Sequence, residues 1–391
     1  MQFAFSEEQE QFRDMVRRFL ADTSPTTEVR RLMETADGFD PGIWERLSSE
    51  LALPGLGIPE QFGGGGFGMV ELCIAMEEMG RALLCAPFFS SAVLSAKAIE
   101  LIADDAQRSR LLPQLASGQL RAALAVTEDD GSPDLAAVKL TARRSGGDFV
   151  LDGDKKFVLD GCSASLLLVV GREPGTEGVD GLSLYAVTAD APGLIRRPLQ
   201  TLDPTRKQAA LCFRGTPATL LGTPGAAGPG LRRVLDLAAI ALANEMMGGA
   251  QRLLEDTVAF TKLRMQFGRP IASFQAIKHR ATDMLLTVEL AKSGAYYAAA
   301  AGDEDDPELP ALASLAKAAA SEAYLQTAID AIQLHGGIGF TWDQDTHLWF
   351  KRAKSSEVLL GDPTWHRERM MQETLDQQAR SKQRPRQEQS A

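Results

Sequence analysis

Two segments in the second half of the chain carry residues suited to an anionic ligand. In the first, Arg264 is followed by Gly268 and Pro270, which end the preceding helical pattern so that the guanidinium projects from a helix end. A guanidinium is the side chain best shaped for paired contacts with a phosphate. In the second, Gly336 and Gly337 let backbone approach a ligand where a Cβ would intrude. Each segment alone also has a structural interpretation. The first could be a basic helix end followed by a turn, and the second a simple helix break.

Composition narrows the class of protein. The 391 residues are 45% hydrophobic and carry a net charge of −11, which indicates a globular protein with two or three cores and disfavours nucleic acid or an anionic membrane surface as partner. The four cysteines and four histidines lack the spacing of a metal site, so we predict no metal. No stretch approaches the roughly twenty apolar residues of a membrane span, and no signal peptide opens the chain, so we expect a cytoplasmic protein.

The period of the apolar residues divides the chain into three domains and a tail. Helical patterns follow a capping box at residues 6–9, and short alternating runs begin near residue 120. Long Ala-rich helical patterns come after a Gly- and Pro-rich stretch, at residues 235–263, 276–301, 312–334 and 351–375. We therefore predict an α+β multidomain protein with an N-terminal helical domain (1–119), a middle β-domain (120–226), a C-terminal four-helix bundle (227–376) and a flexible tail (377–391).

This order of domains resembles the acyl-CoA dehydrogenase fold over nearly the whole chain. The strongest signals are local, because Arg264 and Phe267 match the family's Arg-x-x-Phe-Gly motif and the glycine pair follows at the family's spacing. The resemblance implies that both segments hold the pyrophosphate and adenosine of FAD, a cofactor that this family shares across a subunit interface. The residues that it assigns to the cofactor are Arg264, Phe267, Gln275, Gln333, His335, Gly336 and Gly337.

The middle domain departs from the family's pattern. In the family, a Thr-Glu-Pro-Gly-Ala-Gly-Ser-Asp-type loop and a Trp-Ile-Thr-type strand surround the flavin ring and the phosphates. This chain has Pro133 at the serine position and Leu159 at the threonine position. Pro133 offers neither a hydroxyl nor an amide hydrogen, and Leu159 offers no hydroxyl. We expect the chain's own β-domain to hold a flavin ring poorly.

The catalytic carboxylate is also missing. Dehydrogenation removes a proton alpha to the thioester, so a carboxylate must stand over the flavin. The family's usual glutamate position is Leu360 here, and its alternative position is Ala238. Glu245 lies about two helical turns after Ala238 on the same face. It could serve as a base, or form a buried ion pair or a helix–helix hydrogen bond. Asp343 is another nearby carboxylate.

Three functions stay open. A chain that keeps the dinucleotide grip and loses the base resembles the non-catalytic partner in the heteromeric acyl-CoA dehydrogenases of actinobacterial type, where a base-bearing subunit completes a heterotetramer that introduces an alpha-beta double bond into an acyl-CoA. A self-sufficient homo-oligomer would use Glu245 or Asp343 as base. A non-enzymatic flavin-binding or interaction protein would keep the fold only. The sequence identifies neither the acyl group nor whether the chain alone retains FAD.

Overall fold

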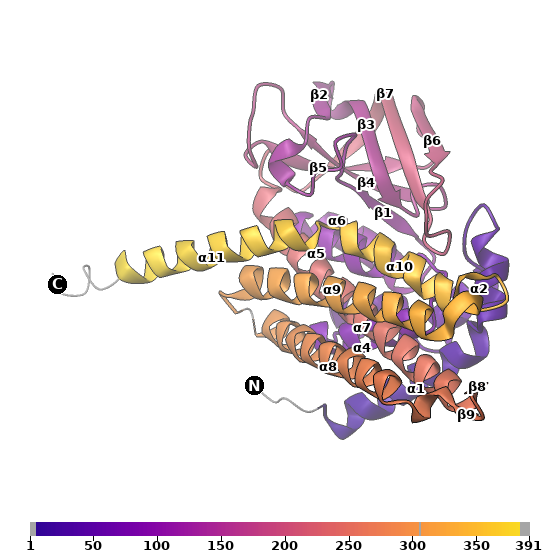
Figure 1. The fold of residues 1–391 in the computed structure, drawn as a ribbon. Helices are drawn as coiled ribbons and strands as arrows, with labels where there is room; N and C mark the ends of the chain where they lie inside the picture. Colours follow the sequence, from indigo (N-terminus) through magenta and orange to yellow (C-terminus); the bar gives the residue numbers. More distant parts are fainter. Residues whose placement is uncertain (1–4, 305, 384–391) are drawn as a thin grey trace. The chain divides into compact units, whose positions relative to one another are not determined.

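The computed structural model describes residues 5–304 and 306–383, and the chain divides into two compact units (Figure 1). One unit consists of Met1–Asp14, Cys73–Ala82 and Ala239–Ala391, and the other of Met15–Leu72 and Leu83–Ala238. Three helices contribute residues to both units: α1 (Glu7–Thr23), α4 (Met69–Arg81) and α7 (Gly228–Leu263). Both units consist of separate stretches of the chain, so they do not test the predicted domain boundaries, which stay a prediction.

The predicted capping box opens α1. The Ser6 hydroxyl accepts from the Gln9 amide (3.2 Å), and the Gln9 side chain accepts from the Ser6 amide (2.9 Å), so two amides at the helix start are satisfied. The helical part of the second unit continues with α2 (Thr26–Met33), α3 (Pro41–Ser49), a π-helix at Phe89–Ser95, α5 (Ala96–Ile102) and α6 (Asp105–Ala116).

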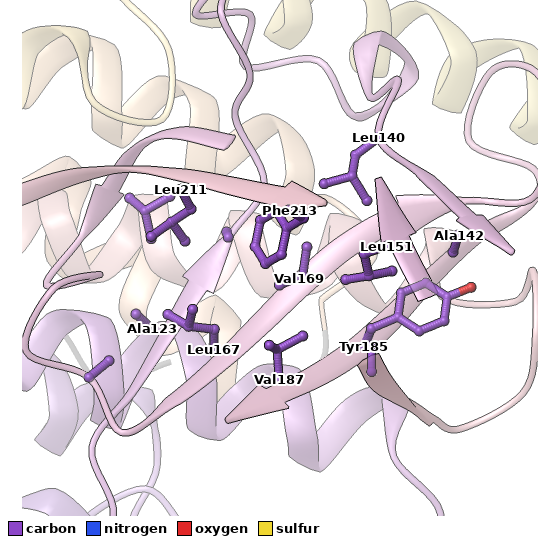
Figure 2. Packing of buried hydrophobic residues seen from close by; sticks show 14 of the residues in the cluster. Ala123, Leu140, Ala142, Leu151, Leu167, Val169, Tyr185, Val187, Leu211 and Phe213 are labelled. Carbon is purple, nitrogen blue, oxygen red and sulfur yellow. The ribbon is translucent and has the colours of Figure 1, made fainter. Parts of the chain in front are cut away.

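The strands of the second unit form a seven-stranded sheet. They are β1 (Ala122–Ala125), β2 (Thr141–Ser145), β3 (Asp148–Leu159), β4 (Leu166–Arg172), β5 (Leu182–Thr188), β6 (Leu194–Pro198) and β7 (Gln208–Leu221). Six strands follow the order β1-β4-β2-β3-β7-β5, and β6 pairs with β7. Because β4 also pairs with β5, the strands close into a barrel. The inward-facing side chains, among them Leu151, Leu167, Tyr185 and Phe213, fill its core (Figure 2).

The first unit is a helix bundle. It contains the later part of α7, α8 (Gln275–Asp303), α9 (Leu309–His335), α10 (Thr346–Val358) and α11 (Pro363–Gln383), and α8 lies along α9 (Figure 1). Small alanine side chains, such as Ala295 and Ala320, fill the buried faces and let the helices approach closely. None of the described helices is long and apolar enough to cross a membrane.

The C-terminal helices differ from the prediction. The single helix expected at residues 351–375 is two helices, because the chain turns through left-handed backbone at Leu360 (φ 62°) and Gly361 (φ 108°) before Pro363 opens α11. The bundle therefore has one helix more than predicted. The first residues of the expected tail, 377–383, belong to α11, and residues 384–391 lie outside the described residues.

Candidate active site and cofactor grip

Arg264 lies where α7 passes into a tight hairpin. Strands β8 (Met265–Gln266) and β9 (Arg269–Pro270) pair antiparallel, and Phe267 (φ 54°) and Gly268 (φ 76°) form the turn between them. Two left-handed residues in a two-residue loop are the pattern of a type I′ turn, which suits glycine at the second position and strains Phe267 at the first. The Arg264 side chain is exposed, and its carbonyl accepts from the Ile271 amide (2.9 Å). The hairpin thus fixes the backbone of Arg264 and leaves its guanidinium free to bind.

The glycine pair ends α9. Gly336 has left-handed backbone (φ 67°) and begins a short 3-10 helix, Gly336–Phe340. In the described chain, a Cβ at Gly336 or Gly337 would have no heavy atom within 4 Å apart from its chain neighbours. The backbone of the pair therefore faces open space, which is the geometry needed for close approach of a ligand.

The structure brings both segments to the same end of the bundle. The rings of Phe260 on α7 and His335 on α9 stack with centroids 4.2 Å apart and planes 22° apart. The Arg264 amide donates to the Phe260 carbonyl (2.9 Å), and Gly336 directly follows His335. The side chains of Gln275, at the start of α8, and of Gln333 are exposed.

The fit to the dinucleotide end of FAD is good at this end of the bundle. An exposed guanidinium, an open glycine backbone and exposed amide side chains are the donors that a pyrophosphate and an adenosine need. Phe267 is 91% exposed, so this large apolar ring is available for contact with a ligand or partner. His335 is different, because its ring is buried against Phe260 and its Nδ1 donates to the Ala331 carbonyl (2.7 Å).

The β-domain residues that the resemblance assigns to the flavin ring offer it few hydrogen-bonding groups. Leu159, at the end of β3, is buried and has no polar atom in its side chain. In the adjoining loop, Glu128 accepts from the amides of Lys139 (3.0 Å) and Leu140 (2.8 Å) and from Lys155 Nζ (2.9 Å). Burial lowers the pKa of Lys155 to about 8. The loop's glutamate is thus committed to holding its own strands together.

The usual base position lies in the turn between α10 and α11. Leu360 is partly buried, and its carbonyl accepts from His366 Nε2 (3.1 Å). Lys317 Nζ, on α9, donates to the carbonyls of Glu357 and Gly361 (3.1 Å each) and to Ser321 Oγ (3.0 Å). Burial lowers the pKa of the His366 imidazole to about 3, so the ring is neutral at pH 7. The turn is firmly held although it carries no carboxylate at the base position.

Glu245 is part of a buried ion pair. Arg352 on α10 donates to its carboxylate at 2.7 Å, and the two side chains are only 6% and 4% exposed. Of the other predicted positions, Ala238 is fully buried and Asp343 is exposed. Asp362, a carboxylate two residues after Leu360, caps α11 by accepting from the Trp365 amide (2.8 Å). The structure therefore gives Glu245 the ion-pair partner that the sequence left open. The described residues contain no cluster that could hold a metal ion.

Sequence reasoning missed the three basic residues of this region, Lys317, Arg352 and His366. Lys317 is the lone charge in the Ala-rich run 313–321, so it was visible as a buried charge in need of a partner. Arg352 stands between Lys351 and Lys354, and the local sequence does not mark it as buried. Their partners could not be found, because they lie 40 and 107 residues away in the sequence.

Comparison with known proteins shows the family of this chain. Three domains of the acyl-CoA dehydrogenase family match the chain: the N-terminal domain at residues 6–119, the middle domain at 123–215 and the C-terminal domain at 231–375. Acyl-CoA dehydrogenase IpdE2 of Mycobacterium tuberculosis is 32% identical over 91% of this chain and 94% of its own length. The chain belongs to the acyl-CoA dehydrogenase family, whose members are FAD-dependent oxidoreductases acting on acyl-CoA thioesters.

Solved structures extend the likeness to the whole fold. A variant of the Tcur3481-Tcur3483 steroid ACAD is similar over 95% of this chain and 99% of its own, with a TM-score of 0.86 and 30% identity. Butyryl-CoA dehydrogenase from Megasphaera elsdenii covers 96% of this chain and 100% of its own with a TM-score of 0.89, and at 24% identity it supports the fold alone. The predicted family and fold are confirmed.

We predict that Glu245→Gln destabilises the protein by about 3–5 kcal/mol, because it removes a carboxylate that neutralises the buried Arg352 guanidinium at 2.7 Å. Glu255→Gln is the matched control, since Glu255 lies on the same helix and pairs with Arg81 while 44% exposed, so its loss should cost about 1 kcal/mol or less. Urea unfolding measures both changes. Equal losses in the two variants would show that the Glu245–Arg352 pair is not a buried ion pair in solution.

We predict that Lys317→Met destabilises the protein by about 2–4 kcal/mol, because the carbonyls of Glu357, in the last turn of α10, and Gly361, in the turn after it, lose a shared donor. Lys354→Met, an exposed position on α10, should stay within about 0.5 kcal/mol of the parent. Limited proteolysis then locates the damage, with new cleavage expected at residues 357–362 in Lys317→Met only. Unchanged stability and cleavage would mean that Lys317 does not hold this turn.

Proposed function

We propose that the chain is the non-catalytic subunit of a heteromeric acyl-CoA dehydrogenase. It contributes the grip on the adenosine and pyrophosphate of an FAD whose flavin ring and base are served by a different, base-bearing chain. One contrast carries the proposal. Arg264 and the Gly336–Gly337 backbone, which together form the dinucleotide grip, are exposed and able to bind a phosphate. The two base positions, in contrast, are Leu360 and Ala238, which have no carboxylate.

The chain's own residues have distinct roles in this assembly. Arg264 binds and neutralises the pyrophosphate, and Gly336 and Gly337 let the backbone approach it. Gln275 and Gln333 offer amides toward the adenosine end, and Phe267 covers it with an apolar ring. When bound, FAD accepts the hydride that leaves the beta carbon of the acyl-CoA. The chain thus holds the cofactor in place and leaves proton removal to its partner.

The comparisons support a heteromeric assembly. The similar structure with 30% identity is called Tcur3481-Tcur3483 steroid ACAD, a name that joins two components and a steroid substrate class. By that likeness, we infer that a CoA thioester of a steroid-derived acid is the first substrate class to test. Straight-chain acyl-CoA thioesters are the comparison.

The self-sufficient alternative needs a base within this chain. Glu245 is the stronger candidate by position, but its carboxylate is already bonded to Arg352 at 2.7 Å. A general base needs a lone pair that faces the substrate proton. Asp343 is exposed to solvent shortly before the start of α10. Neither residue favours the self-sufficient alternative.

We predict that Arg264→Ala weakens FAD binding by about 2–5 kcal/mol in the complete assembly, because a charge contact in low dielectric is lost. Lys262→Ala removes an exposed cation from the last turn of the same helix and should leave FAD binding nearly unchanged. Flavin release followed by fluorescence measures the effect. The same flavin content and release rate in both variants would refute the assignment of Arg264.

We predict that the purified single chain shows no acyl-CoA dehydrogenation above background with an artificial electron acceptor. Leu360→Glu should not restore activity, because the ring site remains poor and the new carboxylate lies in partly apolar surroundings. Mixing with a base-bearing family member from the native host should restore both bound FAD and turnover. Robust turnover by the unmixed chain would overturn the proposal.

A further inference from the structure

We infer that Phe260 and His335 are positioning residues that align the two halves of the dinucleotide grip. This rests on the grip of the proposed function, though not on the identity of the partner chain. Arg264 and the glycine pair belong to different helices, α7 and α9, that are separated in sequence by α8. Their alignment needs a contact between the ends of α7 and α9, and the Phe260–His335 stack is such a contact.

The stack is connected to both halves by short, rigid links. On the α7 side, the Phe260 carbonyl accepts from the Arg264 amide (2.9 Å), so the ring and the guanidinium are one helical turn apart on the same helix end. On the α9 side, Gly336 is the next residue after His335. A shift of one ring against the other would therefore move Arg264 relative to the glycine backbone.

The orientation of His335 is fixed independently of the stack. Its Nδ1 donates to the Ala331 carbonyl (2.7 Å), which sets the ring plane relative to α9. On its other side the chain folds back, and a Cβ at Gly339 would lie 3.0 Å from His335 Cβ, so the 3-10 helix packs closely on it. A side chain with two fixed contacts and a stacked ring has little freedom, which is what a positioning residue requires.

The buried ring also explains why His335 is poorly placed for direct contact with FAD. Its side chain is 9% exposed, whereas Arg264, Gln333 and the two glycines are exposed. An aromatic pair is worth about 0.5–1.5 kcal/mol beyond its buried area. Loss of the alignment should therefore raise the apparent dissociation constant of FAD about 3- to 10-fold.

The test uses the assembly in which the wild-type chain binds FAD, whether with a partner chain or with copies of itself. His335→Ala and Phe260→Ala should each raise the FAD dissociation constant about 3- to 10-fold, and the double variant should be no worse than either single one. His335→Phe keeps a ring and should restore affinity to within about twofold, whereas His335→Gln keeps a donor without a ring and should not. At saturating FAD, kcat should recover in all these variants.

The control is another aromatic pair of the same unit. Phe5 and Tyr296 have ring centroids 4.8 Å apart, and Phe5→Ala should leave the FAD dissociation constant unchanged. A purely structural role for His335 predicts a lower kcat that excess FAD does not restore, with His335→Phe no better than His335→Gln, and either result overturns the inference. If no wild-type assembly binds FAD, the grip and the inference both fall. If the wild type binds FAD and the variants match it, the inference alone falls.

Discussion

A charge buried in a protein needs a partner, and this constraint decides which groups of the chain remain free for chemistry. In the bundle, Glu245 is bonded to Arg352, and Glu77 accepts from Tyr296 (2.8 Å) beside Arg13. Burial raises the pKa of Glu77, as it would for a catalytic base, but its bonds tie helices together. The buried carboxylates described above are thus committed to the fold. The guanidinium of Arg264, in contrast, is exposed at the cofactor end.

The need to pair buried polar groups also explains why the turn between α10 and α11 keeps its structure without a catalytic carboxylate. Lys317 and His366 still donate to the carbonyls of the turn that carries the base in the family, so the turn keeps its left-handed backbone with leucine in the base position. A frame of this kind contributes to stability whether or not it carries a carboxylate. Loss of the base therefore need not disturb the bundle. A subunit of a larger enzyme can therefore lack the catalytic base and still keep the residues that bind the cofactor.

Much of the fold could be predicted from local patterns, and the rest depends on distant contacts. The capping box at Ser6 and the order of helical and β segments depend on neighbouring residues, and the structure contains both. The split between α10 and α11 was missed although Gly361 and Pro363 are local signs of a helix end. The contact from Lys317 to the Gly361 carbonyl, which holds this turn, joins residues 44 positions apart and could not be predicted. The role of Glu245 stayed open because its partner Arg352 lies 107 residues away.

The glycine run at residues 63–66 has a different role from the pair at 336–337. The Gly65 and Gly66 amides donate to the carbonyls of Gly55 and Ile58 (2.9 Å each). A Cβ at Gly64 would lie 2.0 Å from the Ile58 carbonyl oxygen, so glycine is required there by close packing of backbone. At Gly336 the same residue type faces open space instead. Composition alone could not distinguish a packed glycine from one that leaves room for a ligand.

We propose that this chain supplies half of a shared cofactor site. The most direct test is native mass spectrometry of the assembly purified from its own host, with the number of chains and of FAD molecules counted in the same particle. The account predicts two kinds of chain and fewer FAD molecules than chains. A particle built from this chain alone, with one FAD for every chain, would contradict it.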